Sequence, residues 1–253
     1  MQASVMGVMT IGLAGTILLG DIDLSCVGIM AVSAATGILI FKNGIVPIPI
    51  AMIIILIMGA LLGFVNGVLI AKLKAVALIE TLAMNTLLAG VVLAITRGRT
   101  ITINEKGYTI LGQGKIGGFL PFLVIIFLLV YIIMYFVWNR TALGRSLFAV
   151  GGNARCAKVS GINVDRIRIA AFTISGLMAG LAGLMLSSKM GSINSVFGSS
   201  YSMDIIAAAV IGGTSLAGGV GNVSAHAGQL VQVGDAAAGA GVRHHEDGVV
   251  PVQ

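Results

Sequence analysis

A few side chains with hydrogen-bonding groups stand inside otherwise apolar stretches of this sequence. Thr81, Asn85 and Thr86 belong to one such stretch, 75–96, and Asp204 precedes another. Thr81 and Asn85 are four residues apart, which places both on one face of a helix. Hydroxyl, amide and carboxylate groups in an apolar setting either bond to a neighbouring helix or line a path for a polar solute. The sequence leaves both interpretations open.

Two carboxylates, Asp21 and Asp23, lie between two apolar runs in the string LLGDIDLSCVGIM. A carboxylate in hydrocarbon is costly unless it faces water or a partner, so we expect both at a break or an interface. A second interpretation is that Asp23 or Ser25 caps a helix beginning near Leu24.

The elements that position these groups follow from composition. Of the 253 residues, 57% are hydrophobic and only 9% are charged, whereas a water-soluble fold of this size needs far more polar surface. About 20 helical residues cross a hydrocarbon layer of about 30 Å. Four nearly uncharged runs reach that length and are predicted transmembrane helices: 46–71, 75–96, 119–138 and 169–187.

Three shorter, glycine-interrupted runs are predicted to be membrane-embedded spans, half-helices or re-entrant segments: 5–20, 26–41 and 203–217. The predicted fold is therefore an all-α, polytopic bundle of about 6–8 membrane-embedded helices or half-helices.

Glycines recur at four-residue spacing in two of the long runs. They are Gly59, Gly63 and Gly67 in one run and Gly176 and Gly180 in the other. Such spacing gives a helix a smooth face that a neighbouring backbone can approach closely. It favours tight packing inside the bundle over contact in a dimer.

Charge concentrates in the segment 139–168. Seven of the chain's 24 charged residues lie from Arg140 to Arg168, and only one of the seven is acidic. An excess of Lys and Arg is typical of a cytoplasmic loop. Small and apolar residues alternate with these charges as in a short amphipathic helix, which predicts docking on a partner rather than orientation alone.

No motif for catalysis or for binding of a cofactor or metal is present. Neither IGGTSLAGGVGN nor GQGKIG matches the phosphate-binding loop of nucleotide-hydrolysing proteins. Cys26 and Cys156 are expected to be reduced thiols. The histidines all fall in the last segment, where His244, His245, Glu246 and Asp247 are interpreted as part of an unstructured tail rather than as metal ligands. We expect no catalytic residues, no cofactor and no nucleic-acid partner.

Six strings, in order along the chain from about Val5 to Gly221, resemble one family. They are GDIDLS, FVNGVLIAKLK, TLAMNTLLAG, GRSLFAVGGNARCAKVSGI, TISGLMAGLAGLM and YSMDIIAAAVIGGTSLAGGVG. Together they resemble the permease subunits of bacterial ABC importers for simple sugars of the ribose, xylose and galactose type. These belong to a larger group that includes branched-chain amino acid permeases.

The resemblance implies a non-catalytic transport subunit in the bacterial cytoplasmic (inner) membrane. Its implied partners are two ABC ATPase subunits, a periplasmic sugar-binding protein and a second permease, in a homodimer or a heterodimer. The charged loop would contain the coupling helix that fits a cleft on the ATPase, with Ala154, Ala157, Ser160 and Gly161 as coupling residues. Thr81, Asn85 and Thr86 would be candidates for the sugar pathway, with Asp204 a weaker one.

Orientation follows from the charged loop. If 139–168 is cytoplasmic, then 97–118 is periplasmic and Lys72 and Lys74 return to the cytoplasm. The basic residues of 97–118 then lie outside, contrary to the usual charge bias: Arg97, Arg99, Lys106 and Lys115.

The two ends depart from the family pattern. We expect a transmembrane domain over 1–221 that lacks one N-terminal span, followed by an aberrant, disordered tail at 222–253. An alternative is therefore a truncated or frameshifted remnant without transport activity. A permease for another polar metabolite, such as a branched-chain amino acid, also stays open, and a channel or secondary transporter is a weaker choice.

Overall fold

The computed structural model describes residues 2–103, 105–117, 120–211, 213–215 and 218–219. Four of its helices are long and apolar enough to cross a membrane: α3 (Ile48–Leu73), α4 (Ala77–Thr96), α6 (Phe122–Arg140) and α9 (Val164–Met190). Three apolar helices are shorter: α1 (Gln2–Leu18), α2 (Cys26–Lys42) and α10 (Tyr201–Ile211). The prediction of an all-α, multi-pass bundle is confirmed.

The remaining elements are small. They are the helices α5 (Lys106–Gln113), α7 (Ala142–Gly152) and α8 (Ala154–Val159), and the two-residue strands β1 (Ile101–Thr102), β2 (Lys115–Ile116), β3 (Leu120–Pro121) and β4 (Ser192–Ile193). β1 pairs with β4 and β2 with β3, both antiparallel. Within the predicted run 203–217, the described helix α10 ends at Ile211, and Gly213 has a φ of +86°, a conformation that glycine adopts readily.

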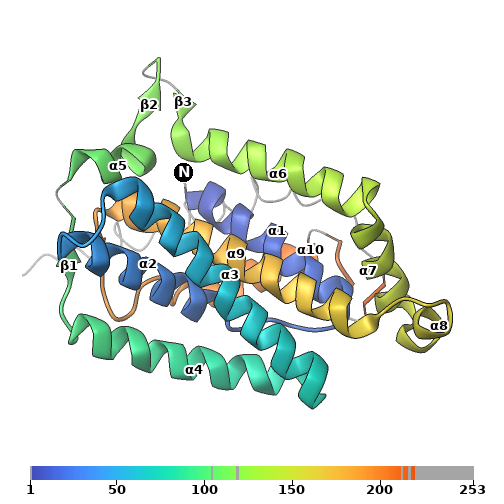
Figure 1. The fold of residues 1–253 in the computed structure, drawn as a ribbon. Coiled ribbons are helices and arrows are strands. Elements are labelled where there is room, and N and C mark those ends of the chain that lie inside the picture. The colour runs from blue at the N-terminus through green and yellow to red at the C-terminus, as the bar shows by residue number, and fades with distance from the viewer. Residues whose placement is uncertain (1, 104, 118–119, 212, 216–217, 220–253) are drawn as a thin grey trace, which may run out of the picture.

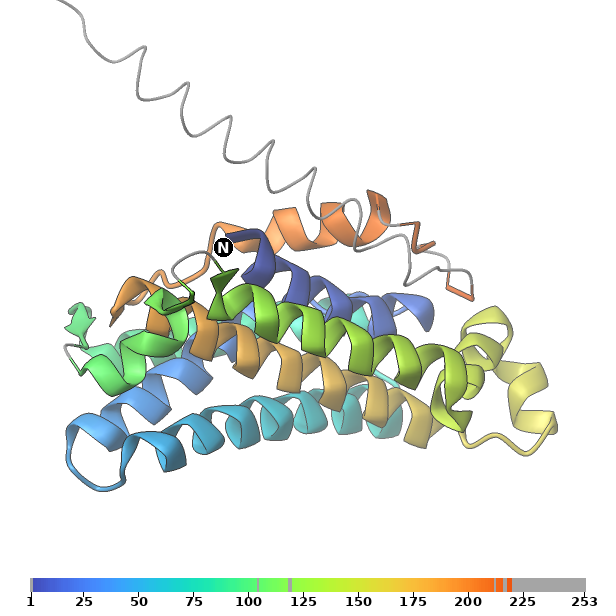
Figure 2. The same cartoon turned by 90° about the horizontal axis from the view of Figure 1, so that it is seen from above.

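Helix α9 runs through the centre of the bundle, with α1, α2 and α3 packed on it (Figure 1). α4 and α6 form opposite outer sides: α4 packs mainly on α2, and α6 packs on α1. Seen from above, α10 lies along α1 on the side away from α3 (Figure 2). The core therefore sits around α1, α2 and α9.

Glycines let α3 and α9 approach backbone to backbone. A Cβ added at Gly63 would lie 2.3 Å from the carbonyl oxygen of Phe172 and 2.9 Å from the Cα of Gly176. One added at Gly59 would lie 2.5 Å from the carbonyl oxygen of Gly176 and 2.8 Å from the Cα of Gly180, and one at Gly67 would lie 2.8 Å from the Cα of Ile169. We call this contact the glycine seam. All five glycines singled out in the sequence lie within it, inside one chain.

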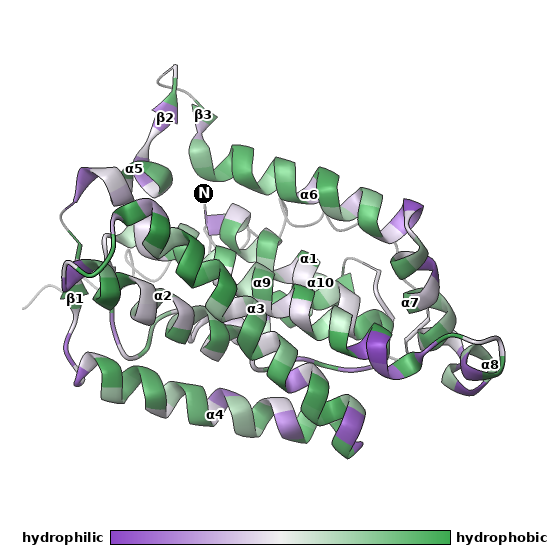
Figure 3. Ribbon diagram, viewed as in Figure 1, coloured by the Kyte–Doolittle hydropathy of each residue, from purple (hydrophilic) through white to green (hydrophobic). Residues whose placement is uncertain are grey.

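The outer faces of α3, α4 and α6 are apolar over most of their length (Figure 3). Large apolar side chains are exposed on all three helices, among them Ile53, Ile57, Leu61, Ile79, Leu82, Leu87, Leu129, Ile132 and Phe136. Such surfaces suit contact with lipid or with another membrane subunit.

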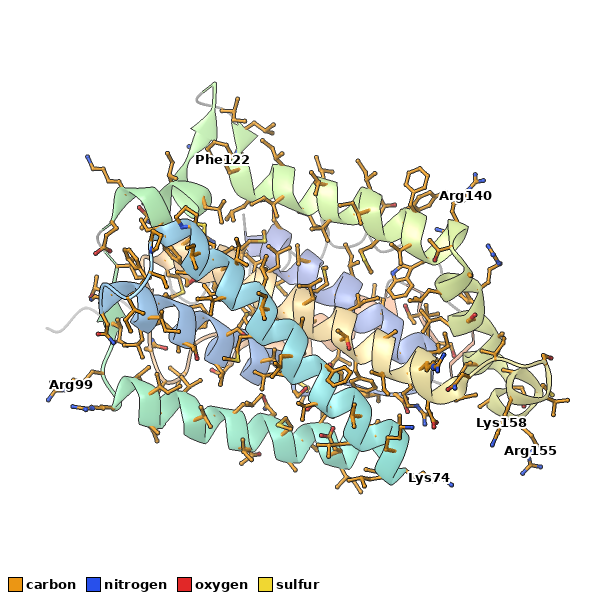
Figure 4. All side chains as sticks on the ribbon, in the orientation of Figure 1. Lys74, Arg99, Phe122, Arg140, Arg155 and Lys158 are labelled. Atoms are coloured by element: carbon orange, nitrogen blue, oxygen red, sulfur yellow. The ribbon has the colours of Figure 1, made fainter. Side chains whose placement is uncertain are left out.

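The two ends of the bundle carry different segments. Lys74, Arg140, Arg155 and Lys158 lie at one end, and Arg99 lies at the other (Figure 4). This is the arrangement expected if the segments around α7–α8 and Lys74 share one side of the membrane. Which side is cytoplasmic stays a prediction.

Helix α5 is held onto the far end of α9 by buried polar contacts. The Tyr108 hydroxyl and Ser187 Oγ form a hydrogen bond of 2.6 Å, and Ser188 Oγ accepts from the backbone N–H of Gly112 at 2.8 Å. Burial raises the pKa of the Tyr108 phenol to about 12, so the phenol stays neutral at physiological pH. This contact fixes the connection between α4 and α6.

The predicted tail at 222–253, with His226, His244 and His245, lies outside the described residues.

Candidate functional site

Several buried polar groups of the bundle meet at the break between α1 and α2, residues 19–25. Asp23 is fully buried: its Oδ1 accepts from the backbone N–H of Ser25 at 3.0 Å and from Ser25 Oγ, and its Oδ2 accepts from Ser175 Oγ at 2.8 Å. Ser25 Oγ in turn accepts from Asn66 Nδ2 at 2.7 Å. The break is thus hydrogen-bonded to both α3 and α9.

An ion pair joins the same break to the N-terminal part of α9. Arg168 Nε lies 2.6 Å from Asp21 Oδ2, and the side chains are 27% and 13% exposed, respectively. The guanidinium offsets the penalty that the carboxylate would otherwise suffer in a low-dielectric setting. Both aspartates lie at a break between helices, as the first interpretation of the sequence expected.

The second interpretation, that Asp23 or Ser25 caps the following helix, is confirmed for Asp23 alone. Asp23 Oδ1 accepts from the free backbone N–H of Ser25 where α2 begins, whereas the Ser25 side chain makes no capping hydrogen bond. A residue from another helix adds a second cap. Asn85 Oδ1 of α4 accepts from the N–H of Gly28, the third residue of α2, at 3.0 Å.

Glycine at position 28 makes this contact possible. A Cβ there would lie 2.8 Å from Asn85 Oδ1 and 3.0 Å from the Cβ of Leu88. One turn before Asn85, the buried Thr81 donates to the carbonyl oxygen of Ile22 in the break at 3.2 Å and to its own helix at Ala77 at 2.8 Å. Thr81 and Asn85 thus share one face of α4, and that face meets the break and α2.

A cavity of about 220 Å³ opens beside Asn85, between α2, α4 and the segment that connects β4 to α10. Because Asn85 Oδ1 is held by Gly28, its Nδ2 group is left for the cavity, and within the described residues it makes no protein hydrogen bond. The remaining lining residues are apolar or carry hydroxyl groups: Val27, Gly28, Ala31, Ala89, Val92, Ser195, Val196, Phe197, Ser199 and Ser202. The cavity therefore combines hydrogen-bonding groups with apolar walls, the combination typical of small-molecule sites.

Of the four residues predicted for a pathway, only Asn85 lines this cavity. Thr81 is buried against the break and Thr86 is exposed, its hydroxyl bonded to the carbonyl of Leu82. Asp204 is half-buried on α10 and does not line the cavity, whereas Ser202 of the same helix does. The sequence argument missed the serines of the cavity. Ser195 and Ser199 lie in a loop with no periodic pattern, and Ser202 lies in the first turn of α10.

The charged loop folds into α7 and α8, each with a side-chain cap. Thr141 accepts from the N–H of Gly144, and Asn153 accepts from the N–H of Cys156. Of the four predicted coupling residues, three are exposed and Ala157 is buried at 4% exposure. Ala157 packs α8 onto the bundle, so the exposed residues Ala154, Ser160 and Gly161 are the ones left for a partner.

Metal-binding chemistry finds no support in the part of the chain that the structure describes. No group of three or more His, Cys, Asp or Glu side chains gathers there in a way that could hold a metal ion. Both cysteines are free thiols: Cys26 is buried and Cys156 is exposed.

Comparison with known proteins agrees with this architecture. Residues 1–241 match the family described as branched-chain amino acid transport system / permease component. The ribose import permease protein RbsC of Haemophilus influenzae is 38% identical over 228 residues, which is 88% of this chain and 69% of that protein. The RbsC protein of Bacillus subtilis is also 38% identical, over 88% of this chain and 69% of its own length.

A galactose permease is similar as well. The galactose/methyl galactoside import permease protein MglC of Haemophilus influenzae is 33% identical over 88% of this chain and 71% of that protein. No solved structure matches the chain. The chain is therefore a non-catalytic, multi-pass membrane component of a transport system and belongs to the branched-chain amino acid transport system / permease component family.

Proposed function

We propose that this chain is the membrane-spanning permease subunit of an ATP-driven ABC importer in the bacterial inner membrane, and that its solute is a simple sugar such as ribose or another pentose or hexose. The similarity to ribose and galactose import permeases supports the class of solute. The cavity beside Asn85 supports it independently, through its chemistry.

The observation that carries the sugar assignment is the absence of charge among the described residues that line this cavity. Their polar groups are one amide and three serine hydroxyls. A branched-chain amino acid is a zwitterion and requires partners for its ammonium and carboxylate groups when it leaves water. A sugar presents neutral hydroxyl groups, which amide and hydroxyl side chains satisfy. The cavity therefore fits a small polyol better than an amino acid.

Size agrees with this assignment. The cavity is about 220 Å³, which is smaller than the roughly 300–1,000 Å³ of sites for drug-sized ligands. It therefore suits a solute as small as a single sugar.

Uptake by a matched pair of variants tests the role of Asn85. The chain is reconstituted in proteoliposomes with the ATPase and the sugar-binding protein encoded beside it, and ATP-driven uptake of ribose, galactose and leucine is measured. Asn85→Leu is expected to lower sugar uptake about tenfold through the lost hydrogen bond and the lost α2 cap. Thr86→Leu, on the exposed side of the same helix, should leave uptake unchanged.

Leucine uptake above that of both sugars would contradict the assignment of the solute. Equal effects of the two substitutions would remove Asn85 from the pathway. If neither the parent chain nor any variant takes up a solute, the result would favour the alternative that the chain is a remnant without transport activity.

The docking of an ATPase on α8 is the second part of the proposal. The side chains of Arg155 and Lys158 project away from the bundle (Figure 4), and Val159 is 85% exposed. An exposed apolar residue beside basic residues suits a protein partner better than water.

Two first-turn alanines provide a matched test of this docking. Ala154→Glu places an acid in the first turn of α8, where the helix dipole favours it, so folding is preserved while the docking surface changes. Ala142→Glu does the same at the start of α7. The ATPase should co-purify with the Ala142 variant and be lost from the Ala154 variant; retention in both would contradict the docking role of α8.

A further inference from the structure

The break between α1 and α2 touches three other helices through polar side chains. Asp21 pairs with Arg168 of α9, Asp23 with Ser175 of α9, and Ser25 with Asn66 of α3. The carbonyl oxygen of Ile22 accepts from Thr81 of α4. Four residues of the break thus receive contacts from α3, α4 and α9, although the break itself is not helical.

On one side, this break is connected to the proposed docking helix. α8 ends at Val159 and α9 begins at Val164, so Arg168 lies nine residues after the end of α8. Arg168 is therefore in the second turn of α9, on the first rigid element that follows α8. A displacement of α8 toward a partner reaches Arg168 through four linking residues and little more than one helical turn.

On the other side, the break leads directly into the wall of the cavity. α2 begins at Cys26, and the next two residues, Val27 and Gly28, line the cavity. Gly28 also holds Asn85 of α4 through its N–H group. A shift of the break therefore moves both walls that enclose the polar end of the cavity.

We propose that Asp21 and Arg168 are positioning residues for transport, whose ion pair transmits movement of the N-terminal end of α9 to the α2 wall of the cavity and to Asn85. The inference rests on the proposed function, because only a transporter needs this movement. The contacts that carry it do not depend on which solute is transported. An ion pair suits this role because it is strong in a poorly hydrated setting and is lost when either charge is removed.

The hydrogen bonds of Asp23 complement the ion pair. Ser175 lies seven residues after Arg168, about two turns along the same helix, so the break is held to α9 at two points. Two points of attachment allow the break to follow a tilt of α9 rather than slide along it.

A cysteine reporter in the cavity makes the coupling measurable without any sugar. Ser199 lines the cavity and is exposed, and Ser199→Cys is made in a chain that carries Cys156→Ser; the remaining Cys26 is buried. The complex with its ATPase is placed in proteoliposomes, and the rate of labelling by a membrane-impermeant maleimide is measured with and without ATP. In the parent chain ATP should change the labelling rate about tenfold.

Charge reversal then tests the ion pair. Asp21→Arg and Arg168→Asp are each expected to abolish the ATP response, and the double variant Asp21→Arg with Arg168→Asp is expected to restore it. Arg166→Asp is the matched control, because Arg166 is exposed on the same helix and forms no ion pair within the described residues. The control should keep the response.

Three results would overturn the proposal: no ATP response in the parent chain, a preserved response in either single variant, or no recovery in a folded double variant. If the reversed charges prevent folding, Asp21→Asn replaces them and should abolish the response while the thermal midpoint of the purified chain is retained. Ribose uptake is measured in the same vesicles. A response without ribose uptake contradicts the proposed sugar and leaves the ion pair supported, whereas uptake without a response contradicts the ion pair alone.

Discussion

Helices α3 and α4 contact the bundle in opposite ways. α3 meets α9 through the glycine seam, where the two backbones lie in close contact. α4 meets the bundle through the side chains of Thr81 and Asn85 and through buried apolar residues such as Leu88 and Val92. The most apolar stretches of the two helices are buried to a similar extent, 22% in α3 and 17% in α4, so the difference lies in the kind of contact and not in its extent.

The difference suggests that α3 and α9 form a rigid unit and that α4 is the helix that moves. Close backbone packing gains dispersion contacts that are lost with a small displacement, so the glycine seam should behave as one rigid body. α4 is held by two hydrogen bonds and a few apolar side chains, without close backbone packing. Elements that move are drawn from such weakly held regions. α4 also forms one wall of the cavity, so a small movement there changes the site.

The largest effect is expected from breaking the seam. Gly63→Ala places a methyl group 2.3 Å from the Phe172 carbonyl oxygen, and because the neighbouring atoms are backbone, the two helices must separate. We expect a loss of about 2–3 kcal/mol in stability, measured as a lower thermal midpoint of the purified chain in detergent.

Gly90 of α4 is the matched control, since no atom lies within 4 Å of a Cβ added there. Gly90→Ala should be neutral or stabilise by up to about 1 kcal/mol, because alanine is the better helix former. Destabilisation of the same size at both positions would show that close packing at the glycine seam does not account for the effect.

A smaller effect is expected where α9 meets the break. Ser175→Ala removes the donor to Asp23 Oδ2 and leaves a buried carboxylate oxygen without that bond. The expected loss is about 1.5–2 kcal/mol, at the lower end of the range for hydrogen bonds to charged groups. Thr173→Ala, in the same helix, removes only a bond to its own backbone at Ile169 and should change stability little. If both variants unfold at the same denaturant concentration, the bond to Asp23 contributes nothing.

The smallest effect is expected on α4. Thr81→Val keeps the shape of the side chain but removes the bond to the Ile22 carbonyl, and polar contacts between membrane helices average about 0.6 kcal/mol. Thr86→Val should have no effect, because its hydroxyl bonds only to its own helix. A loss of several kcal/mol for Thr81→Val would mean that α4 is held as firmly as α3.

The sequence was sufficient to predict the elements. The lengths of the apolar runs located the four long helices to within a few residues, since crossing a bilayer requires that length. Four-residue glycine spacing anticipated a close helix contact, because every fourth residue falls on the same helix face. The charged loop was predicted as a helical docking element, and α7 and α8 occupy it.

The site was predicted only in part, because it depends on contacts between distant residues. Asp23 and Ser175 are 152 residues apart, and nothing local in either segment indicates the other. Thr86 follows Asn85 directly, yet one is exposed and the other lines the cavity, because the rotation of α4 about its axis is set by packing. The cap that Asp23 provides at the start of α2 is local and was predicted, whereas the cap from Asn85 comes from 57 residues away and has no local signal.

The central claim is that α3 and α9 move as one body while α4 moves relative to them. Distances between these helices, measured with and without ATP, test it most directly. Spin labels are attached in two double-cysteine variants of the Cys156→Ser chain, bound to its ATPase in lipid. One pair is Lys72→Cys on α3 with Arg166→Cys on α9, and the other is Ile79→Cys on α4 with Arg166→Cys; all three positions are exposed. The distance between α3 and α9 should stay the same when ATP is added, while the distance between α4 and α9 should change. A shift between α3 and α9, or a fixed distance between α4 and α9, would contradict this claim.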